Sequence, residues 1–167
     1  MKDFNINIFL VNKTKFYEGK EIGDWIRLPN PNLEQDVANI LGEDKELAIH
    51  DAECDFLDVD ENDDVFELNK LAFEIKNLKA HKKTILSCLL ELNYDIRDII
   101  NIVENEGCIF YCDVSNYEEL GEYLIENNYL KVPIEFEKYI DKEKLATDYT
   151  KNKNIYFCKS GHAIEIL

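Results

Sequence analysis

The sequence has 167 residues, and its 35 Asp and Glu residues against 19 Lys and Arg give a formal net charge of −16. This length fits one medium domain or a few small ones, and a hydrophobic content of 46% excludes a wholly disordered chain. A sequence pI near 4.5 argues against nucleic acid as a direct ligand and favours a basic protein partner.

The N-terminal segment predicts a cytoplasmic protein. Its apolar run is short and broken by asparagines, unlike a signal peptide, and no stretch approaches the length of a membrane span. The five cysteines are scattered and odd in number, which indicates reduced thiols. A zinc site at Cys108 and Cys112 would need two more ligands at short spacing, and the three histidines stand far apart in sequence, so we expect no zinc site.

The first part of the chain predicts a small α+β module. Residues 16–19 are typical of a turn, and Asn32 can cap a helix that ends at Gly42. The other elements follow from apolar periodicity. They are a strand at residues 4–11, a second strand at 22–28, the helix at 33–41 and a third strand at 47–54.

Residues 43–67 carry most of the charge, with twelve carboxylates and one cation, Lys45. Most acidic runs are solvated faces, linkers or disordered tails. This one has apolar residues such as Phe56 and Leu57 threaded through it, so it can bury one face. If this segment were helical, it would carry one negative charge per ~3.4 Å of its length, and if fully extended, one per ~7 Å. One strand of B-DNA carries one negative charge per ~3.4 Å. A folded surface of that density could compete for a nucleic-acid groove.

Residues 65–104 differ, because apolar residues recur there at helical spacing and residues 68–103 sum to +2. Four lysines lie among them: Lys76, Lys79, Lys82 and Lys83. The change of charge predicts a boundary near Asp64. We therefore expect an α+β chain of three small modules, α+β over residues 1–62, helical over 63–104 and α+β over 105–167.

The third module is expected to start with a strand at residues 108–114. Ser115 to Glu118 has the pattern of a capping box and opens a helix. Glu118, Glu122 and Glu126 fall on one face of this helix, where like charges cost roughly 0.2–0.5 kcal/mol per pair. The row is either a solvated face or a functional set of carboxylates. The chain is expected to end in a hairpin of residues 154–158 and 163–167.

A short apolar helix is predicted between these elements. Pro133 suits its first turn, and Phe136, Tyr139 and Ile140 follow. With Val132, these side chains put apolar bulk into an acidic module. They either fill the core of that module or contact a second copy of the chain.

No catalytic residue is predicted. Residues 58–69 match a calcium loop only in part, because Asp63 stands where the turn needs glycine and Asn69 where a bidentate glutamate belongs. The sequence contains neither a nucleophile elbow nor a glycine-rich phosphate loop. We expect no enzyme, no cofactor and no specific metal site.

Five short pieces, in order along the chain, carry a family likeness. They are Lys15-Phe16-Tyr17-Glu18-Gly19 with Ile22-Gly23-Asp24-Trp25-Ile26, then Glu46-Leu47-Ala48-Ile49-His50-Asp51, Glu67-Leu68-Asn69-Lys70-Leu71, Val132-Pro133 with Tyr139-Ile140-Asp141, and Gly161-His162-Ala163-Ile164-Glu165-Ile166. Together they resemble the ArdA-type antirestriction proteins.

This resemblance implies a protein made by plasmids and conjugative transposons, with three modules in an elongated, curved body. It implies a homodimer, joined through the third module, that resembles bent B-DNA in shape and charge. Such a dimer occupies the DNA-binding groove of Type I restriction–modification enzymes and inhibits them. The family proteins are not enzymes.

Charge and resemblance together predict two surfaces, with no direct contact to nucleic acid or membrane. The partner-binding acidic surface would consist of Asp51, Glu53, Asp55, Asp58, Asp60, Glu61, Asp63, Asp64, Glu67, Glu118, Glu119, Glu122 and Glu126. The dimer interface would consist of Val132, Pro133, Phe136, Tyr139 and Ile140.

Two features depart from the family pattern. The middle module is positive where a DNA mimic should be negative, and Lys131 precedes Val132-Pro133 where an acid would be usual. Either the basic residues face away from the partner, or inhibition is weaker or more selective. The alternative function is an acidic interaction protein that binds another basic DNA-binding partner, such as a regulator or histone-like protein.

Overall fold

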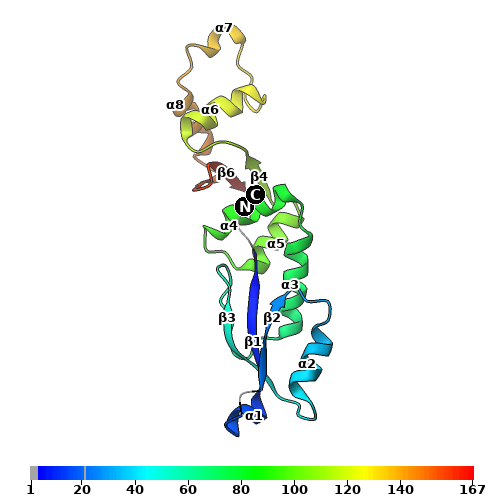
Figure 1. The fold of residues 1–167 in the computed structure, drawn as a ribbon. Coiled ribbons are helices and arrows are strands. Elements are labelled where there is room, and N and C mark those ends of the chain that lie inside the picture. Colours follow the sequence, from blue (N-terminus) through cyan, green and yellow to red (C-terminus); the bar gives the residue numbers. More distant parts are fainter. Residues whose placement is uncertain (1–3, 21) are drawn as a thin grey trace. The chain divides into compact units, whose positions relative to one another are not determined.

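The computed structural model describes residues 4–20 and 22–167, and Figure 1 colours them along the chain. Helices and two small antiparallel sheets confirm the α+β class. The contacts divide the chain into two compact units, Met1–Lys79 and Ala80–Leu167. The division into three modules stays a prediction. Within the described ranges, no helix is both long and apolar enough to cross a membrane.

The first unit is a three-stranded sheet with helices. Its elements are β1 (Ile6–Asn12), α1 (Lys13–Tyr17), β2 (Gly23–Leu28), α2 (Leu33–Leu41), β3 (Leu47–Glu53) and α3 (Val65–Asn77). The strands are antiparallel in the order β2-β1-β3, so β3 is an edge strand. The predicted strands and the helix over residues 33–41 are confirmed.

Two local predictions in this unit need correction. Phe16 and Tyr17, expected in a turn, instead end a short helix, α1, which starts because the Asn12 side chain accepts a hydrogen bond from the Lys15 N–H at 3.1 Å. At α2, Asn32 is the N-cap residue as predicted, but its side chain makes no capping bond. Asn30 instead holds the turn before the helix, because it accepts from the Asn32 N–H at 2.8 Å and its amide donates to Asp36 at 2.7 Å.

The core of the first unit lies between the sheet and helices α2 and α3. Ile6, Ile8 and Leu10 of β1 are fully buried there, and alternation along the strand puts them on one face. Each such side chain contributes about 1.5–3 kcal/mol when fully buried. Val65 and Leu68 of α3 join the same core, so the change of charge near residue 64 lies inside this compact unit.

The second unit combines helices with another three-stranded sheet. Its elements are α4 (Ala80–Leu90), α5 (Ile96–Glu104), β4 (Cys108–Tyr111), α6 (Tyr117–Glu126), α7 (Ile134–Glu137), α8 (Lys142–Thr150), β5 (Asn154–Cys158) and β6 (His162–Ile166). The antiparallel strands are ordered β4-β6-β5, which confirms the C-terminal hairpin and places β6 in the centre.

Helix α8 is absent from the sequence prediction. It begins at a cap, where the Asp141 side chain accepts from the Lys144 N–H at 3.0 Å, but it buries only Ala146, so its apolar periodicity is weak. It packs closely on α6 at Gly121, where a Cβ atom would run into the backbone of Lys142. A glycine in the middle of α6 therefore permits the two helices to approach.

Candidate partner-binding surface

The acidic segment is held on an edge strand and an anchored loop. After β3, the chain turns back, and the Ile49 N–H donates to the Glu61 carbonyl at 3.1 Å, so the loop runs beside the free edge of the strand. Phe56, Leu57 and Val59 pack against the core of the first unit. These apolar anchors turn the intervening carboxylates outward, as the mixed composition predicted.

Four of these carboxylates are exposed and uncommitted. Asp51 lies on β3 and accepts only from the neighbouring Ala52 N–H at 2.8 Å. Asp55, Asp58 and Asp60 lie in the loop and form no ion pair with any described residue. Exposed carboxylates of this kind are available to the cations of a partner.

Three other acids of the predicted surface support the local fold. Asp63 is half-buried and accepts from the Asp60 N–H at 2.9 Å. Asp64 is the N-cap of α3 and accepts from the Phe66 N–H at 2.8 Å. Glu61 pairs with Lys13 at 3.3 Å, a partner too distant in sequence for any local pattern to indicate.

The start of α6 corrects the predicted capping box by one residue. The N-cap is Asn116, whose side chain accepts from the Glu119 N–H at 2.9 Å. The Glu119 carboxylate accepts in turn from the Ser115 N–H at 2.7 Å and from its hydroxyl at 2.8 Å. These bonds lower the pKa of Glu119. Glu119 is thus a capping residue rather than a free surface charge.

The carboxylate row of α6 is partly neutralised. Lys142, the first residue of α8, donates to Glu122 at 2.5 Å, and this bond raises the pKa of Lys142. Glu118 and Glu126 also act on that lysine through their charge. The row is therefore a mixed-charge surface around Lys142, which the sequence did not indicate because α8 was missed.

The predicted dimer residues are not part of any core. Helix α7 has no buried residue, and Phe136 and Tyr139 are 59% and 74% exposed. Phe136 and Tyr139 therefore do not fill the core of their own module, and contact with a second copy stays a prediction. Val132 and Ile140 are half-buried, and Pro133 is exposed.

Sequence reasoning missed Ile134, which follows Pro133 directly and is 79% exposed. It borders a surface hollow of about 330 Å³ together with Ile125 of α6 and Lys138. The sequence could have indicated Ile134, because it lies between Val132 and Phe136 in the same segment of apolar residues.

The four lysines of the predicted middle module are divided between the two units. Lys76 and Lys79 belong to the first unit, and Lys82 and Lys83 to the second. Lys82 is half-buried, and its ammonium donates to the Glu104 carbonyl at 3.5 Å. The sequence grouped these lysines in one module, whereas the contacts assign them to two compact units.

One group of possible metal ligands comes together among the described residues: Cys112, Asp113 and His162. The His162 Nδ1 atom accepts from the Asp113 N–H at 3.0 Å, which occupies its lone pair. The Cys112 thiol donates to the Asp113 carboxylate at 3.4 Å, and this bond raises the pKa of the thiol. These mutual hydrogen bonds account for the short distances between the three side chains.

A comparison with known protein families identifies the family of this chain. A model of the antirestriction protein family ArdA matches residues 8–164. The chain belongs to the ArdA family. This match confirms the resemblance carried by the five sequence pieces. A search of curated proteins finds no significant match.

ArdA proteins are non-catalytic antirestriction proteins, and the family implies inhibition of restriction enzymes. The matched range spans both compact units, including the acidic segment of the first and the exposed apolar residues around α7 in the second. The family match therefore covers both units rather than one of them.

Proposed function

We propose that this ArdA protein mimics double-stranded DNA, occupies the DNA-binding groove of Type I restriction–modification enzymes and so inhibits them. One observation carries the proposal: residues 43–67 hold twelve carboxylates against one cation, on an edge strand and a loop anchored to the core. A folded backbone fixes the spacing of these charges, which distinguishes them from a disordered acidic tail.

The physical basis is competition for cations that bind phosphates. A DNA-binding groove is lined by Lys and Arg, and its affinity for DNA falls steeply with salt because bound counterions are released. A carboxylate surface attracts the same cations over long range, and salt screens this attraction. Each exposed pair contributes only about 0–1 kcal/mol, so affinity depends on many contacts acting together.

We also propose a homodimer that uses Val132, Pro133, Phe136, Tyr139 and Ile140. The exposure of Phe136 and Tyr139 supports it, because a contiguous apolar surface on a soluble protein is typical of an interaction site. A two-fold dimer would present the acidic segment twice.

The test is complex formation with the purified methyltransferase core of Type I enzymes, over a range of salt concentrations. We expect a complex at low salt that weakens as salt rises, together with protection of unmodified DNA in a cleavage assay. No complex with several unrelated Type I enzymes at low salt would sink the proposal. Binding to another basic DNA-binding protein under the same conditions would then favour the alternative function.

A further inference from the structure

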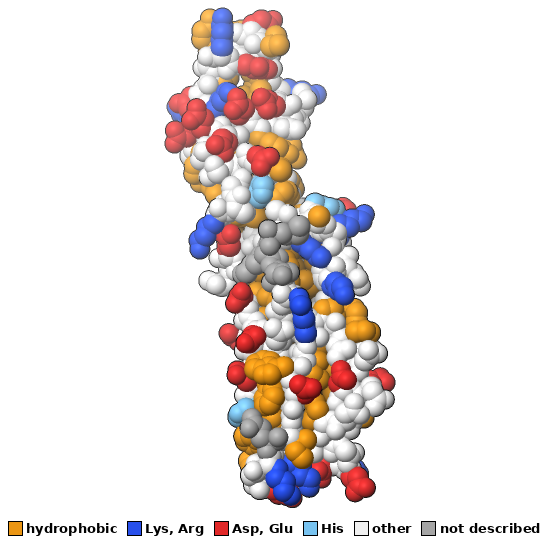
Figure 2. All heavy atoms as spheres, viewed as in Figure 1, with side chains coloured by type: hydrophobic (Ala, Val, Ile, Leu, Met, Phe, Trp, Pro, Cys, Tyr) orange, Lys and Arg blue, Asp and Glu red, His pale blue; other side chains and the backbone are white. Residues whose placement is uncertain are grey.

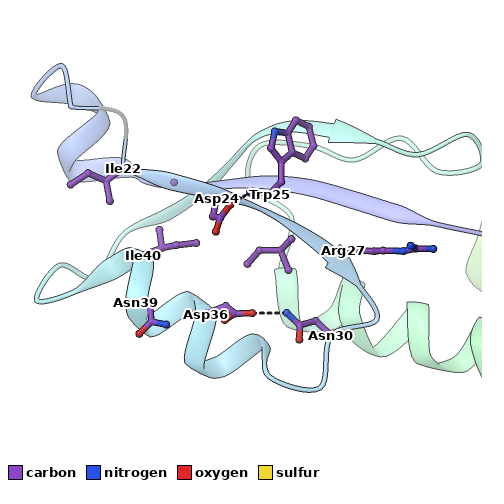
Figure 3. A pocket seen from close by; sticks show the side chains of 10 residues that line it. Ile22, Asp24, Trp25, Arg27, Asn30, Asp36, Asn39 and Ile40 are labelled. Atoms are coloured by element: carbon purple, nitrogen blue, oxygen red, sulfur yellow. Dashed lines mark hydrogen bonds between the residues drawn. The ribbon is translucent and has the colours of Figure 1, made fainter.

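The sheet of the first unit has a second face, and aromatic side chains lie on it. Ile6, Ile8 and Leu10 of β1 face α2 and α3, so alternation turns Phe9 to the opposite side. Figure 3 shows that Trp25 extends from the side of β2 that faces away from α2. Phe9 and Trp25 are directly paired across the strands, and their ring centroids are 5.4 Å apart.

The aromatic row continues towards α1. A register shift after Phe9 leaves His50 as an extra residue of β3, and its ring lies 6.3 Å from Phe9 and 4.7 Å from Phe16. A glycine is needed at position 23, because a Cβ atom there would run into the Leu10 carbonyl oxygen and would lie 3.2 Å from the Phe9 ring. We call Phe9, Phe16, Trp25 and His50 the aromatic face.

The aromatic face is open to solvent. Trp25 is 46% exposed and is the single tryptophan of the chain. Figure 2 shows apolar side chains that reach the surface over the first unit, with acidic side chains beside them. An exposed apolar patch rimmed by polar groups is typical of an interaction site, and tryptophan is enriched among residues that dominate binding energy.

Acidic residues flank the aromatic face on one side. Asp51 pairs with Phe9 in the sheet, and Glu53 pairs with Asn7, so both acids point to the same side as Phe9. Glu53 accepts from the Asn7 amide at 3.2 Å, which confirms this orientation. Phe9 and Asp51 are directly paired on neighbouring strands, which lie about 4.8 Å apart, so the carboxylate lies beside the aromatic face.

The acidic flank continues beyond β3. A surface hollow of about 380 Å³ is lined by His50, Asp51, Asp58 and Glu61, so the aromatic face and the acidic loop share residues. On the other side, Arg27 also lies on this face, but its guanidinium donates to the Asn5 side chain at 2.6 Å. The charged residues beside the rings are thus acidic on β3 and basic on β2, so a bound cation would be attracted towards the β3 side.

We propose that the aromatic face is the docking site for an arginine-bearing segment of the DNA-binding surface of the partner. This proposal rests on the proposed function and names the contact that supplements charge mimicry. A planar guanidinium stacks on an aromatic ring and can pair with a carboxylate at the same time, whereas the compact, strongly hydrated ammonium of lysine gains less. Acidic residues steer the partner over long range, and a tryptophan contact adds affinity that salt does not screen.

The first test uses Trp25 as its own probe in the full-length protein. Hexa-arginine, which contains no tryptophan, should protect Trp25 from acrylamide, with the quenching constant reduced about twofold and hexa-lysine less effective. Asp51→Asn with Glu53→Gln should weaken the hexa-arginine affinity by about tenfold. The proposal is overturned if calorimetry shows hexa-arginine binding while Trp25 quenching stays unchanged, or shows no binding.

The second test compares Trp25→Ala with Phe66→Ala, a matched control because both side chains are 46% exposed and Phe66 lies on α3 rather than on the sheet. Affinity for a Type I methyltransferase core should fall about thirtyfold for Trp25→Ala at every salt concentration, and Trp25→Phe should retain most of it. Equal losses for Trp25→Ala and Phe66→Ala would overturn the docking site. If the unaltered protein binds no Type I enzyme, the proposed function fails, and the hexa-arginine test still decides the docking site.

Discussion

The acidic segment of the first unit and the α6–α8 region of the second use their charges differently. Residues 43–67 contain twelve carboxylates and one lysine, whereas residues 117–153 contain nine carboxylates and six lysines. In the first region, Asp55, Asp58 and Asp60 extend into solvent from a loop fixed by buried apolar residues. In the second region, Glu119 caps a helix and Glu122 pairs with Lys142.

The apolar residues of the two regions show the reverse pattern. Phe56 and Leu57 anchor the acidic loop to the core, while Phe136 and Tyr139 around α7 are exposed. A carboxylate is available to a partner where the fold does not use it, and an apolar residue is available where the core does not cover it. The first region is therefore suited to electrostatic recognition and the second to self-association.

The largest expected effect is on the uncommitted acids. Asp51, Asp55, Asp58 and Asp60 changed together to Asn should weaken binding to a Type I methyltransferase core by about thirtyfold, from roughly 0.5 kcal/mol per charge. The thermal midpoint should stay nearly unchanged, since Asp51 accepts only from the adjacent Ala52 N–H and the other three side chains form no ion pair with any described residue. Titration against one Type I enzyme, with circular dichroism, measures both. An affinity within twofold of the unaltered protein would show that this region is not the recognition surface.

The next effect concerns self-association. Phe136→Asp or Tyr139→Asp should split the dimer, because a charge would be buried in an apolar contact, yet leave the monomer folded, because neither side chain is buried in it. Light scattering should report twice the 19.6 kDa chain mass for the unaltered protein and a single chain for the variants. A monomer at micromolar concentration before any substitution would contradict the dimer. Tyr94→Asp, at another exposed aromatic residue, is the matched control.

A third change separates structural acids from recognition acids. Asp64→Ala removes the N-cap of α3 and should lower the free energy of unfolding by about 1 kcal/mol. The affinity for the partner should fall by no more than the contribution of a single exposed charge. Asp64→Asn keeps the cap and is its control. Urea unfolding of both variants measures the difference, and equal stability of the two would mean that the cap does not support α3.

The sequence predicted best where local chemistry decides. Alternation in β1, the hairpin of β5 and β6, and the acidic composition of residues 43–67 needed no tertiary information. Helix α8 was missed because it buries one small residue, Ala146. The ion pairs Lys13–Glu61 and Glu122–Lys142 could not be predicted, because each joins segments that are distant in sequence. Alternation along β1 also does not indicate which face of the first sheet packs against the helices.

A smaller effect is expected in the second region. Glu118→Gln with Glu126→Gln should weaken partner binding by about threefold or less, because these charges lie around Lys142, which already offsets them. The same titration with Lys142→Gln should strengthen binding slightly if this face meets the partner. If these variants lost more affinity than the four-Asn variant, the α6–α8 region rather than the acidic segment would be the main recognition surface.

The smallest effect is a pH dependence at Glu119. Its hydrogen bonds to Ser115 lower its pKa below 4.5 in the folded protein, so its contribution to stability is present above about pH 4.5 and is lost as pH falls through the folded pKa. Glu119→Gln should therefore reduce stability at pH 7 and remove part of the acid sensitivity below pH 4.5. Thermal unfolding between pH 3 and pH 7 checks this, and parallel profiles for both proteins would contradict it.

The most direct test of DNA mimicry is displacement of DNA from a Type I methyltransferase core that is already bound to a labelled duplex. The account predicts competitive displacement by the full-length protein, with a salt dependence of the same sign as that of DNA. The four-Asn variant should displace the duplex about thirtyfold less well. A ternary complex, in which enzyme, duplex and protein bind at once without loss of DNA affinity, would contradict occupation of the DNA groove.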